Sequence, residues 1–256
     1  MSGTMQLPRE LGSVEAILFD KDGTLLDFTA MWGFWTDHVI GTFRCSLAVR
    51  GLKLAEEDIP HIWGTVHDDQ GHMKGYDIRG PLAMGTMDEV RAIMIWHGYR
   101  AGLTWGESKM MVRDCLLAAD QAMEEARPAT PLPGVREYLE MCREHGVRMG
   151  VVTADETESA KRHLAWMGLD HYFEVVVGTD QVERGKPFPD MLLLACERLG
   201  VRAACAVVIG DTDGDMEMAR SAGAAYRIGI GDPERIRLAD RTVRTFYELV
   251  GGGGAR

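Results

Sequence analysis

Short apolar runs and helix-type patterns alternate through the second half of the chain, and one further apolar run lies near its start. Five apolar runs predict β-strands, at residues 14–19, 147–152, 173–177, 205–209 and 225–230. Helical patterns that each end at a glycine lie between them, at residues 135–145, 156–167, 190–199 and 216–222. Apolar strands separated by helices are typical of a parallel sheet covered on both faces. The pattern therefore predicts an α/β fold with a Rossmann-like parallel sheet.

Residues 28–128 follow a different pattern, in which helical spacing dominates. Five of the six tryptophans and eight of the sixteen methionines lie in this segment, which suits a small core of its own. The glycine-rich stretch 65–86 predicts a loop. Four segments carry apolar residues at helical spacing: 29–50, 56–63, 87–101 and 105–127. We therefore predict an all-helical cap domain at 28–128, inserted into a core domain made of residues 1–27 and 129–256.

Charge and cysteine usage narrow the possible partners and the compartment. The 256 residues include 28 basic and 39 acidic side chains, a net charge of −11, without a basic cluster. Nucleic acids and anionic membranes are therefore not expected partners. No apolar run approaches the roughly 20 residues of a membrane span, and the first ten residues lack a signal peptide's apolar segment. The cysteines are scattered and read as reduced thiols, which indicates a cytoplasmic protein: Cys45, Cys115, Cys142, Cys196 and Cys205.

Two carboxylates follow the first predicted strand directly. Asp20 and Asp22 are separated by one residue, and Gly23 comes next. Alternate side chains of extended backbone share a face, so both carboxylates are expected at the carboxyl end of the strand, where ligands bind in open α/β sheets. Paired carboxylates favour a cation such as Mg²⁺, and Gly23 allows a sharp turn with its N–H toward an anion. An Asx-type turn that caps the next helix explains the same residues.

Thr153 ends the second predicted strand. Its hydroxyl and the N–H groups beside it, such as that of Ala154, suit a phosphate oxygen at a helix N-terminus. A capping box of Thr153 with Glu156, or of Asp155 with Glu158, explains the segment equally well. The choice stays open on these residues alone.

Two later segments add a cation and more carboxylates. Lys186 lies between a glycine and a proline, which restrict its backbone and favour a directed side chain. Asp211 and Asp215 follow the strand at 205–209 and are four residues apart, which brings them to one side of a helical turn. A capping box with Thr212 would explain Asp215 but not Asp211.

The four segments together resemble the motifs of the haloacid dehalogenase (HAD) superfamily of phosphotransferases. They are DKDGTLLD at 20–27, the strand ending in Thr153, GKPFPD at 185–190 and GDTDGD at 210–215. The resemblance implies Asp20 as nucleophile and Asp22 as general acid and base. It implies that Mg²⁺ is held by Asp20, Asp22, Asp211 and Asp215. It implies that phosphate is bound by Thr153, Ala154, Lys186 and Gly23.

The resemblance also points to phosphoester chemistry. Family dehalogenases and phosphonatases replace the residue that matches Asp22, and this chain keeps it. Lys21 departs from the family, where this position is usually apolar or aromatic, and we expect its side chain to point to the opposite face. The insertion is similar to the helical cap of phosphoglycolate phosphatases and β-phosphoglucomutase. Four cap residues are candidates for contacting the leaving group, although solvated loop charge is the simpler interpretation of each: His67, His72, Lys74 and Arg79.

The expected function is that of a Mg²⁺-dependent phosphatase, monomeric or homodimeric, acting on a small phosphorylated metabolite such as phosphoglycolate or a sugar phosphate. A phosphomutase of the β-phosphoglucomutase type is the alternative, since it would use the same phosphorylated aspartate. A signalling receiver is about half as long and lacks a cap. A dinucleotide-binding protein is disfavoured because no G-x-G-x-x-G follows the first strand.

Overall fold

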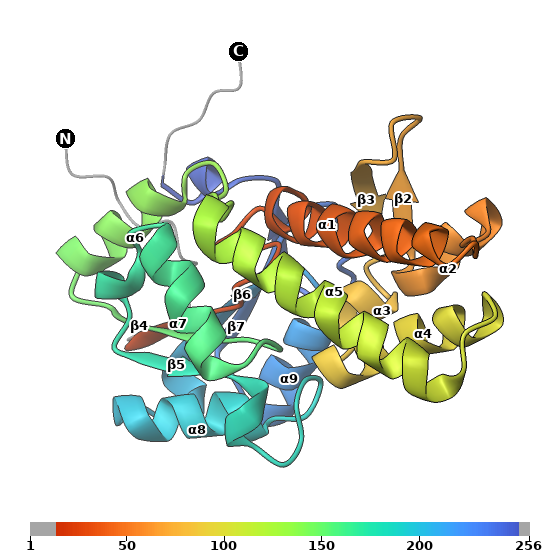
Figure 1. Cartoon of the computed structure of the whole chain (residues 1–256). Coiled ribbons are helices and arrows are strands. Elements are labelled where there is room, and N and C mark those ends of the chain that lie inside the picture. Colours follow the sequence, from red (N-terminus) through yellow and green to blue (C-terminus); the bar gives the residue numbers. More distant parts are fainter. Residues whose placement is uncertain (1–13, 251–256) are drawn as a thin grey trace. The chain divides into compact units, whose positions relative to one another are not determined.

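The computed structural model describes residues 14–250, which form two compact units (Figure 1). One unit contains the chain up to Asp27 and from Ala129 onward, and the other is Phe28–Pro128. The outer ends of the predicted core domain, residues 1–13 and 251–256, lie outside the described residues.

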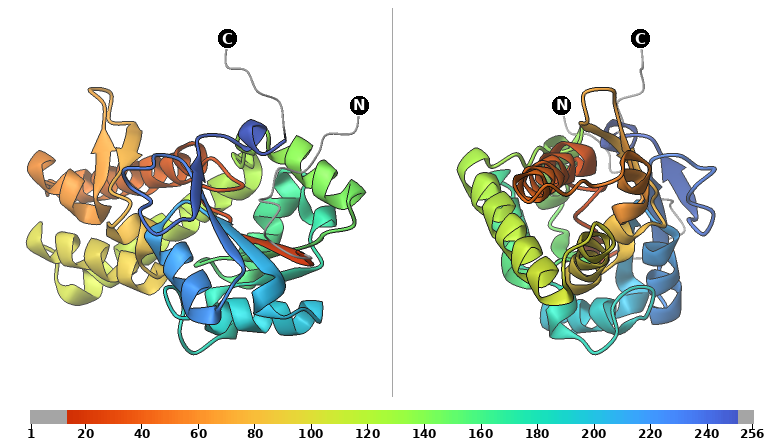
Figure 2. Two further views of the ribbon diagram at one scale, coloured as in Figure 1. Left: turned by 180° about the vertical axis from the view of Figure 1, so that it is seen from behind. Right: turned by 45° about the vertical axis from the view of Figure 1, so that its right-hand side comes forward.

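The first unit is built on a six-stranded parallel sheet, which confirms the predicted α/β fold (Figures 1 and 2). Its strand order is β5-β4-β1-β6-β7-β8, so β1 lies near the centre. Five strands correspond to the predicted apolar runs, whereas β8 is short and has only one buried residue. The strands are β1 (Ala16–Phe19), β4 (Arg148–Val152), β5 (Val175–Val177), β6 (Ala206–Gly210), β7 (Tyr226–Ile230) and β8 (Arg241–Val243).

Helices cover both faces of this sheet, as continuous apolar strands require. Leu18 and Val208 point to one face and belong to a buried cluster with Met191 and Leu192 of α8 and Met218 of α9. On the other face the ring of Phe19 lies edge-on to Tyr138 of α6 and Phe173, at centroid distances of 6.2 and 5.8 Å. The helices are α6 (Val135–Glu144), α7 (Thr157–Trp166), α8 (Asp190–Leu199) and α9 (Asp213–Ala222).

The second unit is mainly but not entirely helical. The stretch 65–86, predicted as a loop, contains an antiparallel hairpin of β2 (Thr65–His67) and β3 (Met73–Tyr76), followed by the short helix α3 (Pro81–Met84). The sequence did not predict the hairpin for two reasons. Its glycines favour a loop, and strands of three and four residues leave little apolar alternation to detect. The other helices are α1 (Phe28–Val49), α2 (Ile59–Trp63), α4 (Met87–Arg100) and α5 (Trp105–Ala126).

Two of the five tryptophans of the second unit lie in its own core, whereas Trp96 and Trp105 are half exposed. Trp35 and Trp63 are buried with rings 5.3 Å apart. The indole N–H of Trp35 donates to Asp120 at 2.8 Å, and that of Trp63 donates to the carbonyl of Val90 at 2.9 Å. Each buried indole therefore has a partner for its polar edge.

The hairpin histidines make contacts within the second unit. His67 Nε2 lies 2.8 Å from the Thr65 hydroxyl, and His72 Nδ1 lies 3.0 Å from Asp37 of α1. The contact of His72 with Asp37 fastens the hairpin to α1. Lys74 lies in β3, and the Arg79 guanidinium is 3.7 Å from the carboxylate of Asp77.

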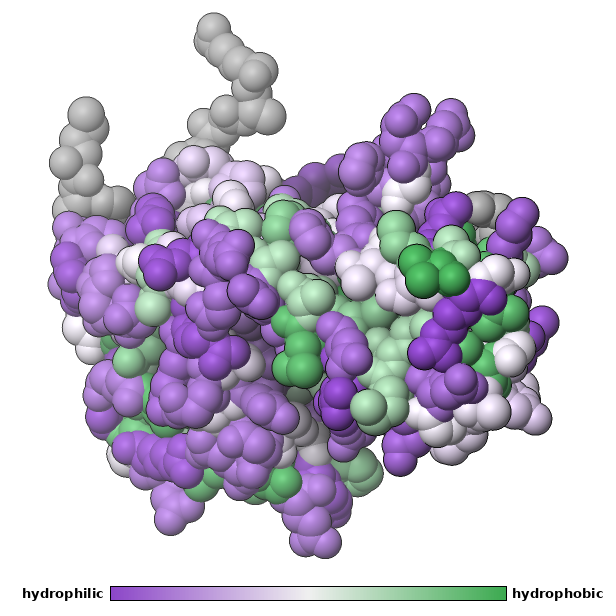
Figure 3. Space-filling view, viewed as in Figure 1, coloured by the Kyte–Doolittle hydropathy of each residue, from purple (hydrophilic) through white to green (hydrophobic). Residues whose placement is uncertain are grey.

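The surface of the second unit has apolar positions along α5. Figure 3 shows hydrophobic residues gathered over this helix, where Met110 and Leu117 are exposed. Within residues 14–250, each helix is too short or too polar to cross a membrane.

Candidate active site

Asp20 lies at the centre of the site because β1 lies near the centre of the sheet. Its backbone N–H still donates to Ile209 of β6 at 2.8 Å, which fixes the point where the chain leaves the sheet. In a parallel sheet all strands end at the same edge, so the residues after β1, β4 and β6 meet there. Thr153 and Asp211 follow β4 and β6, which places them at the same edge as Asp20.

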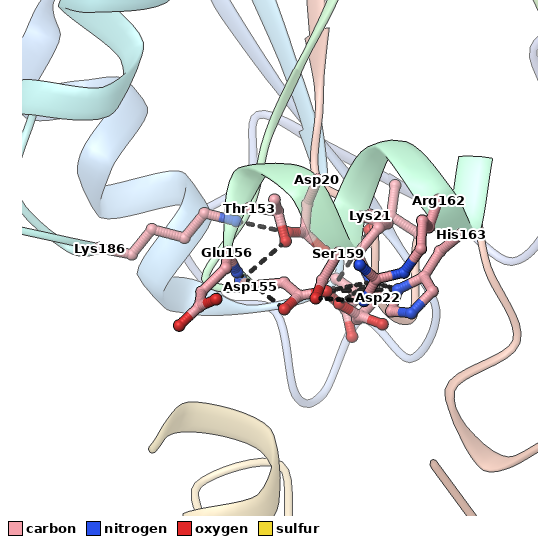
Figure 4. Close-up of polar contacts among 12 residues, drawn as sticks. Asp20, Lys21, Asp22, Thr153, Asp155, Glu156, Ser159, Arg162, His163 and Lys186 are labelled. Atoms are coloured by element: carbon pink, nitrogen blue, oxygen red, sulfur yellow. Dashed lines mark hydrogen bonds and ion pairs between the residues drawn. The ribbon is translucent and has the colours of Figure 1, made fainter. Parts of the chain in front are cut away.

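Lys186 reaches this edge from the loop before α8. Its Nζ lies 2.5 Å from Asp20 Oδ1 (Figure 4). The same Nζ lies 2.6 Å from Asp215 Oδ1. Arg184 holds the loop by a double hydrogen bond to Asp190, at 3.1 and 3.0 Å. Burial opposes the charge of Lys186, but Asp20 and Asp215 raise its pKa above the usual value. The ammonium group is therefore charged.

Asp20, Asp211 and Asp215 form a group of carboxylates. One oxygen of each lies within 4.8 Å of the others. Burial, together with Asp215 and Asp22, raises the pKa of Asp20 to about 7 despite the opposing effect of Lys186. Burial and the neighbouring Asp20 and Asp215 raise the pKa of Asp211 well above its usual value. Three carboxylates around one ammonium leave negative charge uncompensated, so the donor set fits a hard divalent cation such as Mg²⁺.

A glycine is needed at position 23 because the backbone there lies close to the carboxylate of Asp211. Its φ is +79°, and a Cβ atom there would lie 2.2 Å from Asp211 Oδ2. Its N–H donates to the carbonyl of Leu26 at 2.9 Å. The N–H is thus engaged inside the turn, which corrects the prediction that Gly23 offers it to a phosphate.

Thr153 is fully buried at the end of β4. Its N–H donates to Val177 at 3.0 Å, and its hydroxyl oxygen accepts the N–H of Asp155 at 3.1 Å. Neither predicted capping box forms: α7 has Glu156 at its N-cap without a side-chain bond. Instead Asp180 Oδ1 accepts from both the N–H and the hydroxyl of Thr157, at 2.7 Å. Ala154 is exposed in the loop.

The capping interpretation of Asp215 is confirmed, and it does not exclude a role in the site. Thr212 accepts the N–H of Asp215, and Asp215 Oδ2 accepts the N–H and hydroxyl of Thr212. The other oxygen, Oδ1, lies against Lys186. Asp213, which matches no family function, accepts the N–H groups of Arg237 and Leu238 at 2.8 and 3.1 Å.

Asp22 lies apart from the carboxylate group, against expectation. Its Oδ2 is 2.7 Å from Nζ of Lys21, and it is not among the three clustered carboxylates. The alternation of a strand does not extend to it, because β1 ends at Phe19 and the chain turns at Lys21. The structure thus places three of the four predicted metal ligands in one group, and the role of Asp22 as a fourth ligand stays a prediction.

Lys21 also corrects an expectation, since its side chain does not point away from Asp22. It is fully buried, and besides Asp22 it lies 3.2 Å from Asp155 Oδ2 and 3.1 Å from His163 Nδ1 (Figure 4). Sequence reasoning missed Asp155 and His163 as neighbours of the site. The available signal was a charged residue at an apolar position of the first motif, since such a residue needs buried partners.

The fold and the site define an α/β enzyme with its reactive groups at the carboxyl ends of the central strands. The chain belongs to the haloacid dehalogenase-like hydrolase family, whose model matches residues 14–223. This confirms the resemblance drawn from the four motifs.

Relatives of similar length carry phosphatase names. The chain is 38% identical to "Probable phosphatase IndB" of Dickeya dadantii over 93% of both proteins. It is 37% identical to N-acetylmuramic acid 6-phosphate phosphatase of Pseudomonas aeruginosa, over 86% of this chain and 85% of that one. The crystal structure of a HAD phosphatase from Thermococcus onnurineus has the same fold, with a TM-score of 0.63, 24% identity and coverage of 92% and 95%. The chain is therefore an enzyme of the phosphoric monoester hydrolase class.

Proposed function

We propose that this chain is a Mg²⁺-dependent phosphatase that hydrolyses a small phosphorylated metabolite through a phosphorylated Asp20. The observation that carries the proposal is the contact of Lys186 with both Asp20 and Asp215, while Asp211 lies within the same 4.8 Å group. A buried carboxylate at the edge of a central strand, beside a lysine and further carboxylates, is suited to attack phosphorus in a charge-neutralised pocket.

The side chains divide the reaction into two steps. In the first, an oxygen of Asp20 forms a bond to phosphorus, the bond to the leaving oxygen breaks, and Asp22 donates its proton to that oxygen. In the second, Asp22 takes a proton from water as the water oxygen bonds to phosphorus, and the bond to Asp20 breaks. Inorganic phosphate and the free carboxylate of Asp20 result.

Asp20, Asp211 and Asp215 are the residues that would hold Mg²⁺. The ion would supply positive charge for the transferring phosphoryl group. Lys186 adds its own charge, and Thr153 and the N–H of Ala154 are the proposed hydrogen-bond donors to the phosphate oxygens. Burial, together with Asp215 and Asp22, raises the pKa of Asp20 to about 7, and this disfavoured negative charge supports the need for such a cation.

For the substrate, we propose a sugar phosphate or a compound of the phosphoglycolate type. Support comes from the relative that acts on N-acetylmuramic acid 6-phosphate. We further propose that residues 28–128 act as a cap domain that closes over this substrate. Domain closure would exclude water from the phosphorylated aspartate.

The test is a panel of phosphorylated metabolites assayed with Mg²⁺, with EDTA, and with the Asp20→Asn variant. We expect phosphate release with Mg²⁺, none with EDTA, and a loss on the order of 10⁴-fold or more in the variant, because the amide is a poor nucleophile. Chromatography of the products separates hydrolysis from transfer to a second hydroxyl. Undiminished phosphate release by Asp20→Asn would refute the nucleophile.

A further inference from the structure

Lys21 is a buried charge that the catalytic steps above do not use. It is fully enclosed, and its ammonium group contacts Asp22 at 2.7 Å, Asp155 at 3.2 Å and His163 at 3.1 Å. Moving an ammonium group out of water costs several kcal/mol unless partners compensate. An apolar side chain would fill the same space without this cost. The charge therefore calls for a function other than packing.

Two partners of Lys21 lie after β4 and in α7 of the first unit. Asp155 follows β4, and its Oδ1 accepts the N–H of Glu156 at 2.7 Å. His163 lies in α7, its ring 5.0 Å from that of Trp166 and its Nδ1 3.3 Å from Asp155 Oδ2. Each partner is thus fixed by a contact outside the cluster.

Accessibility rises along this cluster toward Asp22. The exposed fraction of the side chain is 0% for Lys21, 4% for His163, 9% for Asp155 and 18% for Asp22. The three more enclosed residues therefore lie behind Asp22, which is the most accessible of the four. Buried ion pairs contribute little net stability, but they do fix the orientation of the groups that they join.

We propose that Lys21, Asp155 and His163 are positioning residues that hold the carboxyl group of Asp22 where it exchanges a proton with the leaving oxygen. This inference rests on the proposed function, in which Asp22 is the general acid and base. Lys21 grips Asp22 through Oδ2, and Asp155 and His163 hold Lys21 in turn. In this chain, a polar support takes the place of an apolar residue within the first motif.

The inference predicts a specific kinetic defect. If Asp22 is misplaced, proton transfer to the leaving oxygen lags behind the breaking of the bond between that oxygen and phosphorus. The rate then depends more strongly on how basic the leaving group is. General packing damage would instead slow good and poor leaving groups by the same factor.

The experiment compares p-nitrophenyl phosphate with phenyl phosphate, which has a more basic leaving group and a similar shape. For Lys21→Met we expect kcat to fall on the order of 100-fold with phenyl phosphate and less than about tenfold with p-nitrophenyl phosphate. Asp22→Asn should show the same discrimination between the two substrates, that is, a greater loss with phenyl phosphate, and its losses should be larger. Leu199→Ala, which opens the buried core at the end of α8, is the control for packing damage and should affect both substrates equally.

Two further variants guard against misfolding. Lys21→Met/Asp155→Asn removes one positive and one negative charge together, and should discriminate like Lys21→Met. Asp155→Asn keeps the side-chain shape and the contact of Lys21 with Asp22, and should give an intermediate discrimination. Circular dichroism establishes that each variant is folded.

The outcomes separate the inference from the function on which it rests. Equal losses with both substrates in the folded Lys21 and Asp155 variants, while Asp22→Asn discriminates, would overturn the inference alone. An Asp22→Asn variant that does not discriminate would overturn the general acid in the proposed function. The inference and the proposed function are both supported if the Lys21, Asp155 and Asp22 variants all lose more activity with phenyl phosphate than with p-nitrophenyl phosphate, while Leu199→Ala loses the same with each.

Discussion

Two buried lysines of the first unit lie in similar surroundings with opposite electrostatic results. Lys186 lies between Asp20 and Asp215, and Lys21 lies between Asp22 and Asp155. Around Lys186, burial and carboxylate neighbours raise the pKa of Asp20 to about 7. Burial alone would likewise raise that of Asp155, but Lys21 and His163 outweigh it and lower the pKa to about 2.

The two clusters differ in how much negative charge is left without a cationic partner. Near Lys186, three carboxylates share one ammonium, so the cluster is left short of positive charge. Near Lys21, two carboxylates share one ammonium, which leaves a smaller surplus of negative charge. We therefore assign binding and chemistry to the first cluster, and support of Asp22 to the second.

The largest expected effect comes from removing the positive charge of Lys186 in the first cluster. Lys186→Met should lower kcat/KM by about 10³-fold, because it removes both a phosphate-binding charge and the partner of the nucleophile. Steady-state kinetics at saturating Mg²⁺ measures this. Lys186→Arg is the matched control, which keeps the charge but changes the geometry, and should retain part of the activity. Equal activity of all three proteins would contradict the assignment of binding to this cluster.

The raised pKa of Asp20 predicts how stability varies with pH in protein freed of metal by EDTA. In the unfolded chain the carboxyl group of Asp20 loses its proton near pH 3.8, whereas in the folded protein it keeps the proton up to about pH 7. The folded state therefore loses stability as the pH rises between these values. The penalty approaches about 4 kcal/mol above pH 7. Urea unfolding should therefore show Asp20→Asn gaining stability over wild type from pH 4 to 7. A flat difference would argue against the raised pKa of Asp20.

For Asp155 the sign is the reverse. Its folded pKa of about 2 lies below the ordinary 3.8, so its contribution is present above pH 4 and disappears as pH falls toward 2. Asp155→Asn should cost about 2 kcal/mol at pH 7 and little near pH 2. The same unfolding series measures it. If Asp20→Asn and Asp155→Asn gave difference curves of the same slope, the contrast between the two clusters would fail.

The smallest effect is expected at His163. Burial lowers its pKa, against the hydrogen bond of Asp155 that raises it, so the ring is neutral at pH 7. His163→Gln keeps a polar partner for Lys21 and should cost about 1 kcal/mol of stability and less than about threefold in kcat. Thermal unfolding and the phenyl phosphate assay test this. A loss as large as that of Lys21→Met would move His163 into a more direct role.

The sheet and the positions of Asp20, Thr153 and Asp211 were open to prediction for one physical reason. Apolar runs identify buried parallel strands, and parallel strands deliver the residues that follow them to one edge. Lys186 lies in a loop, where no periodicity applies, and its expected place came from resemblance to the family. Its contact with Asp20 appears only in three dimensions.

Sequence reasoning failed where a local rule was carried too far. Period-2 alternation was applied through Asp22, although β1 ends at Phe19. Lys21 was consequently expected on the opposite face from Asp22. Its partners Asp155 and His163 lie more than a hundred residues away, and no local pattern signals such a pairing.

The most direct test of the account is a covalent one. Wild-type protein mixed with an excess of substrate and Mg²⁺ is quenched in acid within milliseconds, digested and analysed by mass spectrometry. We predict that one phosphoryl group is found on the peptide containing Asp20, and that Asp20→Asn lacks it. Full turnover with no phosphorylated peptide, or with the phosphoryl group on another residue, would contradict the account.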